Sequence, residues 1–337
     1  MIKNTLVETS FDALAADGAL GGRKSSVTIG NFDGCHRGHQ SLVKNACDIG
    51  HLLEADATVV TFTPHPDCFF RGDQATALLF TAEQKRRAFK ELGLDRLVIQ
   101  TFDEAFAKVG HQEFYDDHLR RRLGLVALTV GANFRFGKGR GGDTEYLLAR
   151  SAADGVKITI DSGVMFAGEP ISSSRLRLLL AEGGDAASAA VMLGRPYLLE
   201  GIIERGDQLG RTLGVPTANL EQVRQLVPRF GVYAGYVWLA PEGGPTDARP
   251  TILARDARAV RAVFGIGVRP SIKSAAKAAL RIEAHLLDGT YGENALYGCR
   301  AGFYLTDWLR GEETFPSLDA LTVQMRADIV RARTLLR

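Results

Sequence analysis

The chain has 337 residues, 45% of them hydrophobic and 24% charged, which is the composition of a soluble globular protein of about two domains. Its 41 basic and 39 acidic residues leave a net charge of +2, which argues against nucleic acid or an anionic membrane as a main partner. No apolar run approaches the ~20 residues that span a bilayer, and the first residues do not form a secretory signal. The four cysteines, Cys35, Cys47, Cys68 and Cys299, form no metal-ligand spacing and favour a reducing compartment, so we expect a cytoplasmic protein.

Strand-like runs rich in Val, Ile and Thr alternate with helical patterns over the first half of the chain. The predicted strands are 25–30, 57–64, 95–100, 125–131 and 156–160, and the predicted helices are 39–53, 81–93, 111–124 and 143–155. Strands separated by helices of this length predict βαβ units and a parallel sheet. Right-handed crossovers then place helices on both faces, so we expect a doubly wound α/β domain.

The pattern changes after residue 183. A stretch rich in Gly, Ala and Ser predicts a linker helix over 184–194. Short apolar runs without intervening helices follow at 197–203, 231–239, 249–253, 262–268, 280–287 and 299–309. Such spacing predicts an antiparallel β-barrel. A final helix is expected over 317–336, with one apolar face formed by Leu318, Leu321, Met325, Ile329 and Val330.

The strongest local motif is GNFDGCHRGH, residues 30–39, which follows the first predicted strand and opens a helix. His36 and His39 are three residues apart, so both imidazoles can share one face of the helix. Together with the free amides and positive dipole of the helix N-terminus, they predict a site for an anion such as phosphate. The alternative is a pair of surface histidines at a helix cap. Zinc is disfavoured because no third ligand shows suitable spacing nearby.

Two further motifs bear on phosphate binding. The serines of ISSSRLR, residues 171–177, could form a simple N-cap, but beside the histidine motif they favour phosphate binding. GANFRFGKGRGGD, residues 131–143, contains a GxGxxG pattern but comes too late in the sheet for a dinucleotide fold, and it fails the Walker pattern. The histidine loop is therefore the expected phosphate site.

In the second half, GDQLGRTLGVPTANL at residues 206–220 is a glycine-rich loop that leads into a strand. Strand alternation projects the oxygen-bearing side chains of Thr217 and Asn219 to one face, where they could hold a hard cation such as Mg²⁺. Without its neighbours, this motif would indicate only a surface turn and an edge strand. In RIEAHL, residues 281–286, Glu283 and His285 point the same way and could equally form a solvated face.

Together, GNFDGCHRGH, TFTPHP, GANFRFGKGRGGD and ISSSRLR resemble the adenylyltransferase module of bacterial bifunctional riboflavin kinase/FAD synthetases. GRTLGVPTANL, GVYA, the strand that contains Glu283, and LYG resemble the kinase module, so the resemblance covers about the whole chain. It implies a doubly wound nucleotidylyltransferase domain over 1–183, which transfers AMP from ATP to FMN and releases pyrophosphate. The linker 184–194 and a riboflavin kinase domain over 195–337 would follow. ATP, riboflavin and FMN would be the substrates, and Mg²⁺ the cofactor.

The resemblance also implies roles for residues of the first domain. His36 and His39 would be the catalytic, phosphate-binding histidines. The remaining substrate-binding residues would be Gly30, Asn31, Phe32, Asp33, His65, Asn133, Ser173, Ser174 and Arg177. Asn133 replaces a common Asp, and Ser174 replaces the usual Thr.

In the second domain, the resemblance makes Glu283 the base that takes the proton of the riboflavin 5′-hydroxyl. Thr217 and Asn219 would bind the metal, while Gly210, Arg211, Gly214 and Pro216 would form the nucleotide loop. The chain departs from the family pattern at Gly265, at Ser271 and in LDGTYGENALYG, all on the flavin side.

Two alternatives remain open at this point. The first is an FMN adenylyltransferase whose barrel binds flavin without kinase activity, which the presence of Thr217, Asn219 and Glu283 opposes. The second is a flavin-binding regulator without turnover. The histidine pair and ISSSRLR oppose that alternative, because flavin binding alone needs no grip on a triphosphate.

Overall fold

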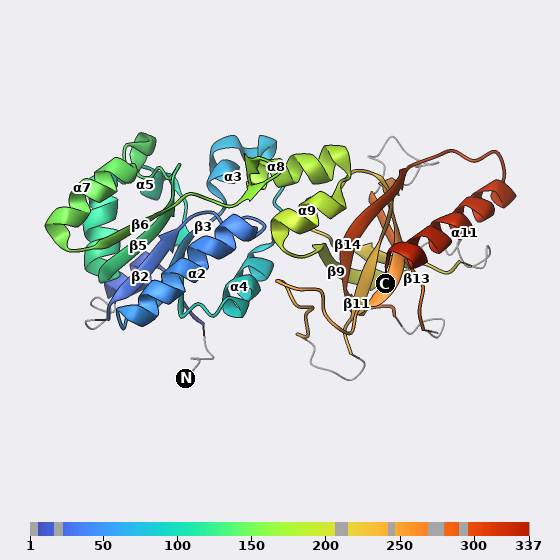
Figure 1. Ribbon diagram of the computed structural model, residues 1–337, viewed down its shortest axis with the longest axis horizontal. Helices are drawn as coiled ribbons and strands as arrows, with labels where there is room; N and C mark the ends of the chain where they lie inside the picture. Colours follow the sequence, from blue (N-terminus) through green and yellow to red (C-terminus); the bar gives the residue numbers. More distant parts are fainter. Residues whose placement is uncertain are drawn as a thin grey trace. The chain divides into compact units, whose positions relative to one another are not determined.

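The computed structural model describes residues 6–16, 23–205, 215–241, 247–268, 280–289 and 296–336 (Figure 1). The chain divides into two compact units, Met1–Ser172 and Ser173–Arg337. This division precedes residue 183, where the sequence predicts the domain boundary. The reason is that the helix α9 (Ala186–Leu193), expected to be a linker, packs on strands β9 and β14 of the second unit.

The first unit is built on a six-stranded parallel sheet in the order β1-β4-β3-β2-β5-β6. Its strands are β1 (Val7–Thr9), β2 (Ser25–Ile29), β3 (Asp56–Thr63), β4 (Arg96–Thr101), β5 (Leu125–Gly131) and β6 (Lys157–Asp161). A two-stranded sheet, β7 (Met165–Phe166) and β8 (Glu169–Pro170), follows. The sheet confirms the expected doubly wound fold, to which the structure adds the edge strand β1.

Helices cover both faces of this sheet and give it two cores. They are α1 (Phe11–Ala16), α2 (Arg37–Leu52), α3 (Pro66–Arg71), η1 (Gly72–Gln74), α4 (Ala82–Glu91), α5 (Glu104–Ala107), α6 (His111–Glu113), the π-helix η2 (Phe114–Arg122), η3 (Lys138–Arg140) and α7 (Thr144–Asp154). On β3, the buried Val59 packs with residues of α2 and α4, while the next residue, Val60, packs with residues of α1 and η2. Consecutive side chains of a strand point to opposite faces, so one strand serves both cores.

The strand order fixes where a ligand site can form. From the central strand β2, the chain first builds β3 and β4 on one side and then returns to build β5 and β6 on the other. The order reverses between β2 and β5, and loops that leave the carboxyl ends of these two strands diverge to opposite faces. In open α/β sheets, such a switch point is where ligands bind.

The second unit is a closed antiparallel barrel, as expected, in the order β10-β13-β12-β11-β14-β9. Its elements are α8 (Ser173–Leu178), the π-helix η4 (Leu179–Gly183), α9, β9 (Tyr197–Glu204), β10 (Ala218–Glu221), β11 (Gly231–Leu239), β12 (Val260–Val268), β13 (Leu280–Leu286), β14 (Arg300–Gly311) and α11 (Leu318–Leu335). Closure leaves no open sheet edge, which removes the exposed backbone groups that promote aggregation.

Two expectations for this unit are wrong. Residues 249–253, predicted as a strand, form an irregular segment. On α11, Leu318 and Val330 are exposed, and the covered face instead carries Leu321, Met325 and Ile329. The polar Asp328 lies in that face as well, because Arg310 of β14 pairs with it, and a sequence pattern based on apolar residues overlooks such a position.

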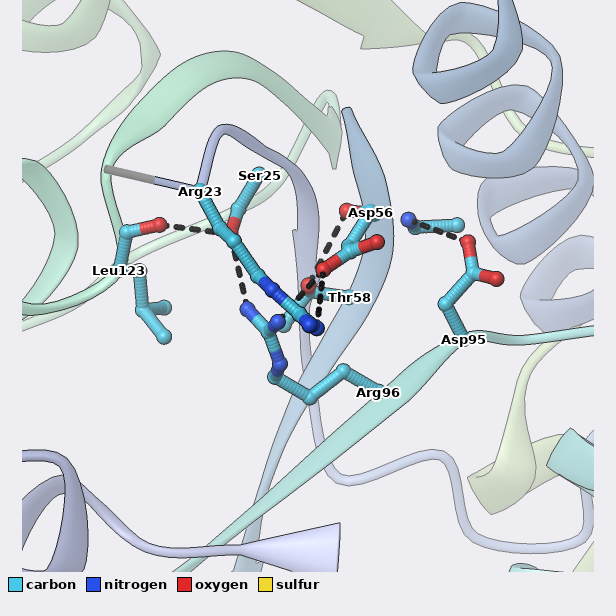
Figure 2. A network of polar contacts seen from close by, with 8 residues as sticks. Arg23, Ser25, Asp56, Thr58, Asp95, Arg96 and Leu123 are labelled. Atoms are coloured by element: carbon cyan, nitrogen blue, oxygen red, sulfur yellow. Dashed lines mark hydrogen bonds and ion pairs between the residues drawn. The ribbon is translucent and has the colours of Figure 1, made fainter. Parts of the chain in front are cut away.

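A buried polar network joins the first residues of three parallel strands, at the edge opposite the switch point (Figure 2). The Arg96 side chain is 3% exposed and donates to the Asp56 carboxylate at 2.5 Å and to the Ser25 hydroxyl at 3.3 Å. Ser25 in turn donates to the Leu123 carbonyl at 2.6 Å. Burial lowers the pKa of Arg96, and Asp56 opposes that shift. The network therefore fixes the register of β2, β3 and β4.

Replacement of Arg96 by Met should destabilise the first unit by about 3–5 kcal/mol, because it leaves the Asp56 carboxylate, which is only 11% exposed, without its inner partner. Arg23 is the matched control: its side chain is 66% exposed and lies 3.7 Å from the same carboxylate, so Arg23→Met should cost less than about 1 kcal/mol. Both tryptophans, Trp238 and Trp308, belong to the second unit. In Arg96→Met, the unfolding transition followed by far-UV circular dichroism should therefore shift to lower denaturant concentration. The transition followed by tryptophan fluorescence should not move. Equal effects of the two variants would contradict the prediction.

Candidate active sites

The loop between β2 and α2 carries the GNFDGCHRGH motif and has an unusual backbone. Phe32 and Cys35 adopt positive φ angles of 52° and 40°, which non-glycine residues rarely do and which recur at functional sites. Phe32 is fully buried in the core, and both carboxylate oxygens of Asp33 accept backbone amides, from Leu79 and Phe80, at 3.0 Å. The structure therefore places these two predicted binding residues beneath the loop, where they hold its shape.

The two histidines of the motif stack on each other, with ring centroids 3.6 Å apart and an angle of 16° between the planes. The Nδ1 atom of His36 accepts the backbone N–H of His39 at 3.3 Å and so caps α2. A Cβ on Gly38 would lie 3.2 Å from the His36 ring, so glycine leaves the space that this ring needs. His36 is therefore an N-cap of α2 through one of its two ring nitrogens. This arrangement places both imidazole rings at the positive end of a 16-residue helix.

His39 is uncharged at neutral pH. Burial lowers its pKa well below the usual value, and the neighbouring His36 and Lys85 lower it further. Its Nδ1 atom is buried without a hydrogen-bond partner in the described residues. A buried polar atom of this kind is rare unless a ligand or water completes it. The histidine pair therefore fits an anion, which would supply negative charge and a hydrogen-bond acceptor for the Nδ1 atom of His39.

A cavity of about 920 Å³ opens at the switch point of the sheet. Gly30 and Asn31 after β2, His65 after β3 and Asn133 after β5 line it, so it unites four predicted residues from three separate motifs. His65 is fixed there because its Nδ1 atom accepts the backbone N–H of Asp67 at 3.1 Å. Sequence analysis missed the aromatic part of the lining, which consists of Phe62, Phe70, Phe102, Phe106, Phe114, Phe134 and Phe136. Such a wall suits a flat aromatic ring.

The serine motif lies at the start of the second unit. Helix α8 begins at Ser173; Ser174 is exposed, while Ser173 and Arg177 are half-buried. In the first unit, the Ile171 backbone N–H donates to the Val164 carbonyl at 2.9 Å, which fixes the chain just before the serines. A role of these residues in phosphate binding remains a prediction.

In the barrel, β10 and β13 place Asn219 directly opposite Glu283. Paired residues on neighbouring strands project to the same face, so the predicted metal ligand and the predicted base are adjacent. Asn219 is 5% exposed, and its Oδ1 atom has no hydrogen-bond partner in the described residues. A buried carbonyl oxygen without a donor fits coordination to a hard cation.

Thr217, Glu283 and His285 line a second cavity, of about 220 Å³. The Nδ1–H of His285 donates to the Pro216 carbonyl at 2.9 Å, which ties the segment before β10 to β13. Gly265, one of the positions where the chain departs from the family pattern, is paired with Glu283 and has open space where a Cβ would be. The glycine therefore leaves room beside the carboxylate. Gly210, Arg211, Gly214 and Ser271 lie outside the described residues.

The opposite wall of this cavity comes from α11, which sequence analysis did not connect with the site. Leu321, Met325 and Ile329 make it apolar. Arg310 of β14 holds the helix in place through Asp328, to which its guanidinium donates at 2.8 Å and 3.0 Å. The cavity thus combines the polar groups of Thr217 and Glu283 with apolar side chains of α11, and the Arg310–Asp328 pair lines it as well.

Residues 21–175 match the family model for FAD synthetase, and residues 193–336 match that for riboflavin kinase. Two relatives named bifunctional riboflavin kinase/FMN adenylyltransferase are 35% identical to the chain. The Escherichia coli (strain K12) relative aligns over 307 residues and 91% of each chain, and the Pseudomonas fluorescens relative over 309 residues and 92% of each. A solved structure described as a macrolide-efflux protein from Streptococcus pneumoniae has a TM-score of 0.80 over 99% of both chains; at 24% identity, it shows a shared fold alone. None of the helices in the described ranges is both long and apolar enough to span a membrane.

The stability of the first unit should fall as the pH drops below about 6.5, the usual pKa of histidine in an unfolded chain. His39 has a lowered pKa, so in this range the unfolded chain binds a proton that the folded chain does not, at up to about 1.4 kcal/mol per pH unit. His39→Gln should flatten this dependence, measured by urea denaturation between pH 5 and 7. The exposed His51 on the same helix is the control, and a similar flattening in His51→Gln would contradict the prediction.

Proposed function

The chain belongs to the family of bifunctional riboflavin kinase/FMN adenylyltransferases, and from this premise we propose which residues carry out its two reactions. The enzyme phosphorylates riboflavin to FMN with ATP and then adenylylates FMN to FAD with release of pyrophosphate. The adenylyl transfer belongs to the part that matches FAD synthetase, and the kinase reaction to the part that matches riboflavin kinase. The scattered cysteines are all free, so we propose the cytoplasm as its location.

Two features carry the proposal for adenylyl transfer: the cavity at the switch point, and the stacked histidines, which do not line it but belong to the same motif as Gly30 and Asn31 of its lining. The flavin ring would lie against the aromatic wall, while His36, His39 and the N-terminus of α2 hold phosphates. Gly30, Asn31, His65 and Asn133 would position the substrates, and Ser173, Ser174 and Arg177 would hold the triphosphate. An FMN phosphate oxygen attacks the α-phosphorus in line, and the bond to the pyrophosphate oxygen breaks. The attacking oxygen is already ionised, so catalysis is positioning and charge neutralisation.

The juxtaposition of Asn219 and Glu283 beside the smaller cavity carries the proposal for the kinase. Glu283 accepts the proton of the riboflavin 5′-hydroxyl as that oxygen attacks the γ-phosphorus, and ADP leaves. The apolar residues of α11 would cover the flavin ring. The nucleotide loop would comprise Gly210, Arg211, Gly214 and Pro216.

We also propose that Thr217 and Asn219 hold Mg²⁺. A hydroxyl and an amide oxygen are suitable ligands, and the unpartnered Oδ1 atom of Asn219 fits this role. When bound with ATP, the ion would neutralise charge on the phosphates. The residues themselves would orient the nucleotide toward Glu283.

The direct test is to incubate the purified chain with riboflavin, ATP and Mg²⁺ and to separate riboflavin, FMN and FAD over time. FMN should appear first and FAD second, and EDTA should stop FMN formation. Conversion of supplied FMN but not of riboflavin would favour an adenylyltransferase with an inactive barrel. Tight flavin binding with intact ATP would favour a regulator.

His36→Asn should slow FAD formation from FMN by about 10²–10³, or roughly 3–4 kcal/mol, because it removes an imidazole that contacts phosphate in the transition state. Asn is a good N-cap, so α2 should survive the substitution. FMN formation by the same preparation is the internal control and should not change. An unimpaired rate of FAD formation would exclude His36 from the reaction.

Glu283→Gln should slow FMN formation by about 10²–10⁴, because Gln keeps the size of the side chain but cannot accept the proton. Riboflavin binding, followed by quenching of flavin fluorescence, should persist. FAD formation from supplied FMN should stay normal. If the side chain were merely a solvated strand residue, neither rate would change, and loss of both would indicate misfolding.

A further inference from the structure

Lys85 is a half-buried cation that the assignments above leave unused. It lies in α4, where Arg86 pairs with Glu8 and Glu83, Arg87 lies 4.0 Å from Glu83, and Lys90 is exposed. Lys85 lines a small cavity of about 60 Å³ together with Asp33, Thr61 and Arg86. Phe62 and His65 line both this cavity and the large one at the switch point, so Lys85 lies one layer of side chains behind the substrate cavity.

The Lys85 ammonium is connected to the histidine loop. Its Nζ donates to the Thr61 hydroxyl at 3.4 Å, and Thr61 donates to the Asn31 carbonyl at 3.4 Å. This is the one hydrogen bond that the ammonium makes to the described residues, although it has three N–H groups. Asp33, the nearby carboxylate, already accepts two backbone amides. The ammonium is therefore anchored to the loop, and the charge of Asp33 offsets the cost of its burial only in part, because the pKa of Lys85 stays lowered.

Burial of an ammonium is unfavourable, and it lowers the pKa of Lys85 while Asp33 raises it. An uncharged side chain of similar length would fill the same space without that cost, so charge is the property that this position supplies. The charge of Lys85 acts on His39, which is itself neutral. Lys85 thus contributes a positive electrostatic potential at the histidine pair, which the neutral imidazole of His39 does not itself provide.

We propose that Lys85 is a positioning residue for adenylyl transfer: from behind the histidine loop, it supplies the positive charge that holds the polyphosphate of a nucleoside triphosphate, and it fixes Asn31 through Thr61. This inference rests on the proposed function of the first unit. It predicts that the charge and its placement matter more than the packing of the side chain.

The test compares Lys85→Met, Lys85→Arg and the control Lys90→Met, which removes the same charge from the surface of the same helix. Lys85→Met should raise the KM for ATP in FAD formation and lower kcat/KM by about 10- to 100-fold, the range for residues that act from behind a contacting group. The KM for FMN should change less than about twofold, and pyrophosphate should inhibit this variant more weakly. Lys85→Arg should recover most of the activity, and Lys90→Met should equal the wild type.

Two results would overturn the proposal. One is a wild-type KM for ATP in Lys85→Met. The other is an equal loss of activity in Lys85→Met and Lys85→Arg, in which kcat falls, the KM for ATP is unchanged and the denaturation midpoint is lowered. That combination is the signature of a purely structural lysine. The wild-type chain is assayed first, so failure to form FAD at all would count against the proposed function and not against Lys85. FMN formation by each variant checks the second unit.

Discussion

Parallel pairing of β2, β3, β4 and β5 is the constraint on which the proposed adenylyltransferase site depends. Parallel strands end at one edge, so loops far apart in the sequence meet there. Asn31, His65 and Asn133 reach one cavity for this reason, although they follow three different strands. The polar network at the opposite edge, centred on Arg96, maintains the register of β2, β3 and β4 and so keeps the ends of these strands aligned at the cavity.

In the mechanism that we propose, the two units handle the same co-substrate, ATP, by different means. In the first, the attacking phosphate is already ionised, and the site offers a helix N-terminus, two stacked imidazoles and a cation behind them. In the second, the attacking hydroxyl carries a proton, and the site offers a carboxylate beside a buried amide oxygen. The protonation state of each nucleophile accounts for the difference between a site without a base and a site with one.

The sequence predicted the alternation of strands and helices, the barrel and the motifs, because these depend on local periodicity and on residues close together in the chain. The aromatic wall was missed because Phe62 lies in β3 while Phe102 and Phe134 follow β4 and β5, and none of them is unusual by itself. Lys85 was missed because a lysine in a charged helix looks like surface. Conversely, Phe32 was predicted to bind substrate, but the positive φ angle of the loop turns it into the core.

The substrate contacts of the first unit come from separate parts of the sheet. The histidines that we propose to hold phosphate lie on the loop after β2 and at the start of α2, whereas the aromatic wall comes from β3 and from the segments that follow β3, β4 and β5. Gly30 and Asn31 of the histidine loop also line the cavity, but the aromatic side chains of its lining all lie outside that loop, so the recognition of the acceptor can diverge while the reaction is retained. Conversion of this scaffold to a different acceptor, in evolution or by redesign, would require replacement of these aromatic side chains and no change in the two histidines.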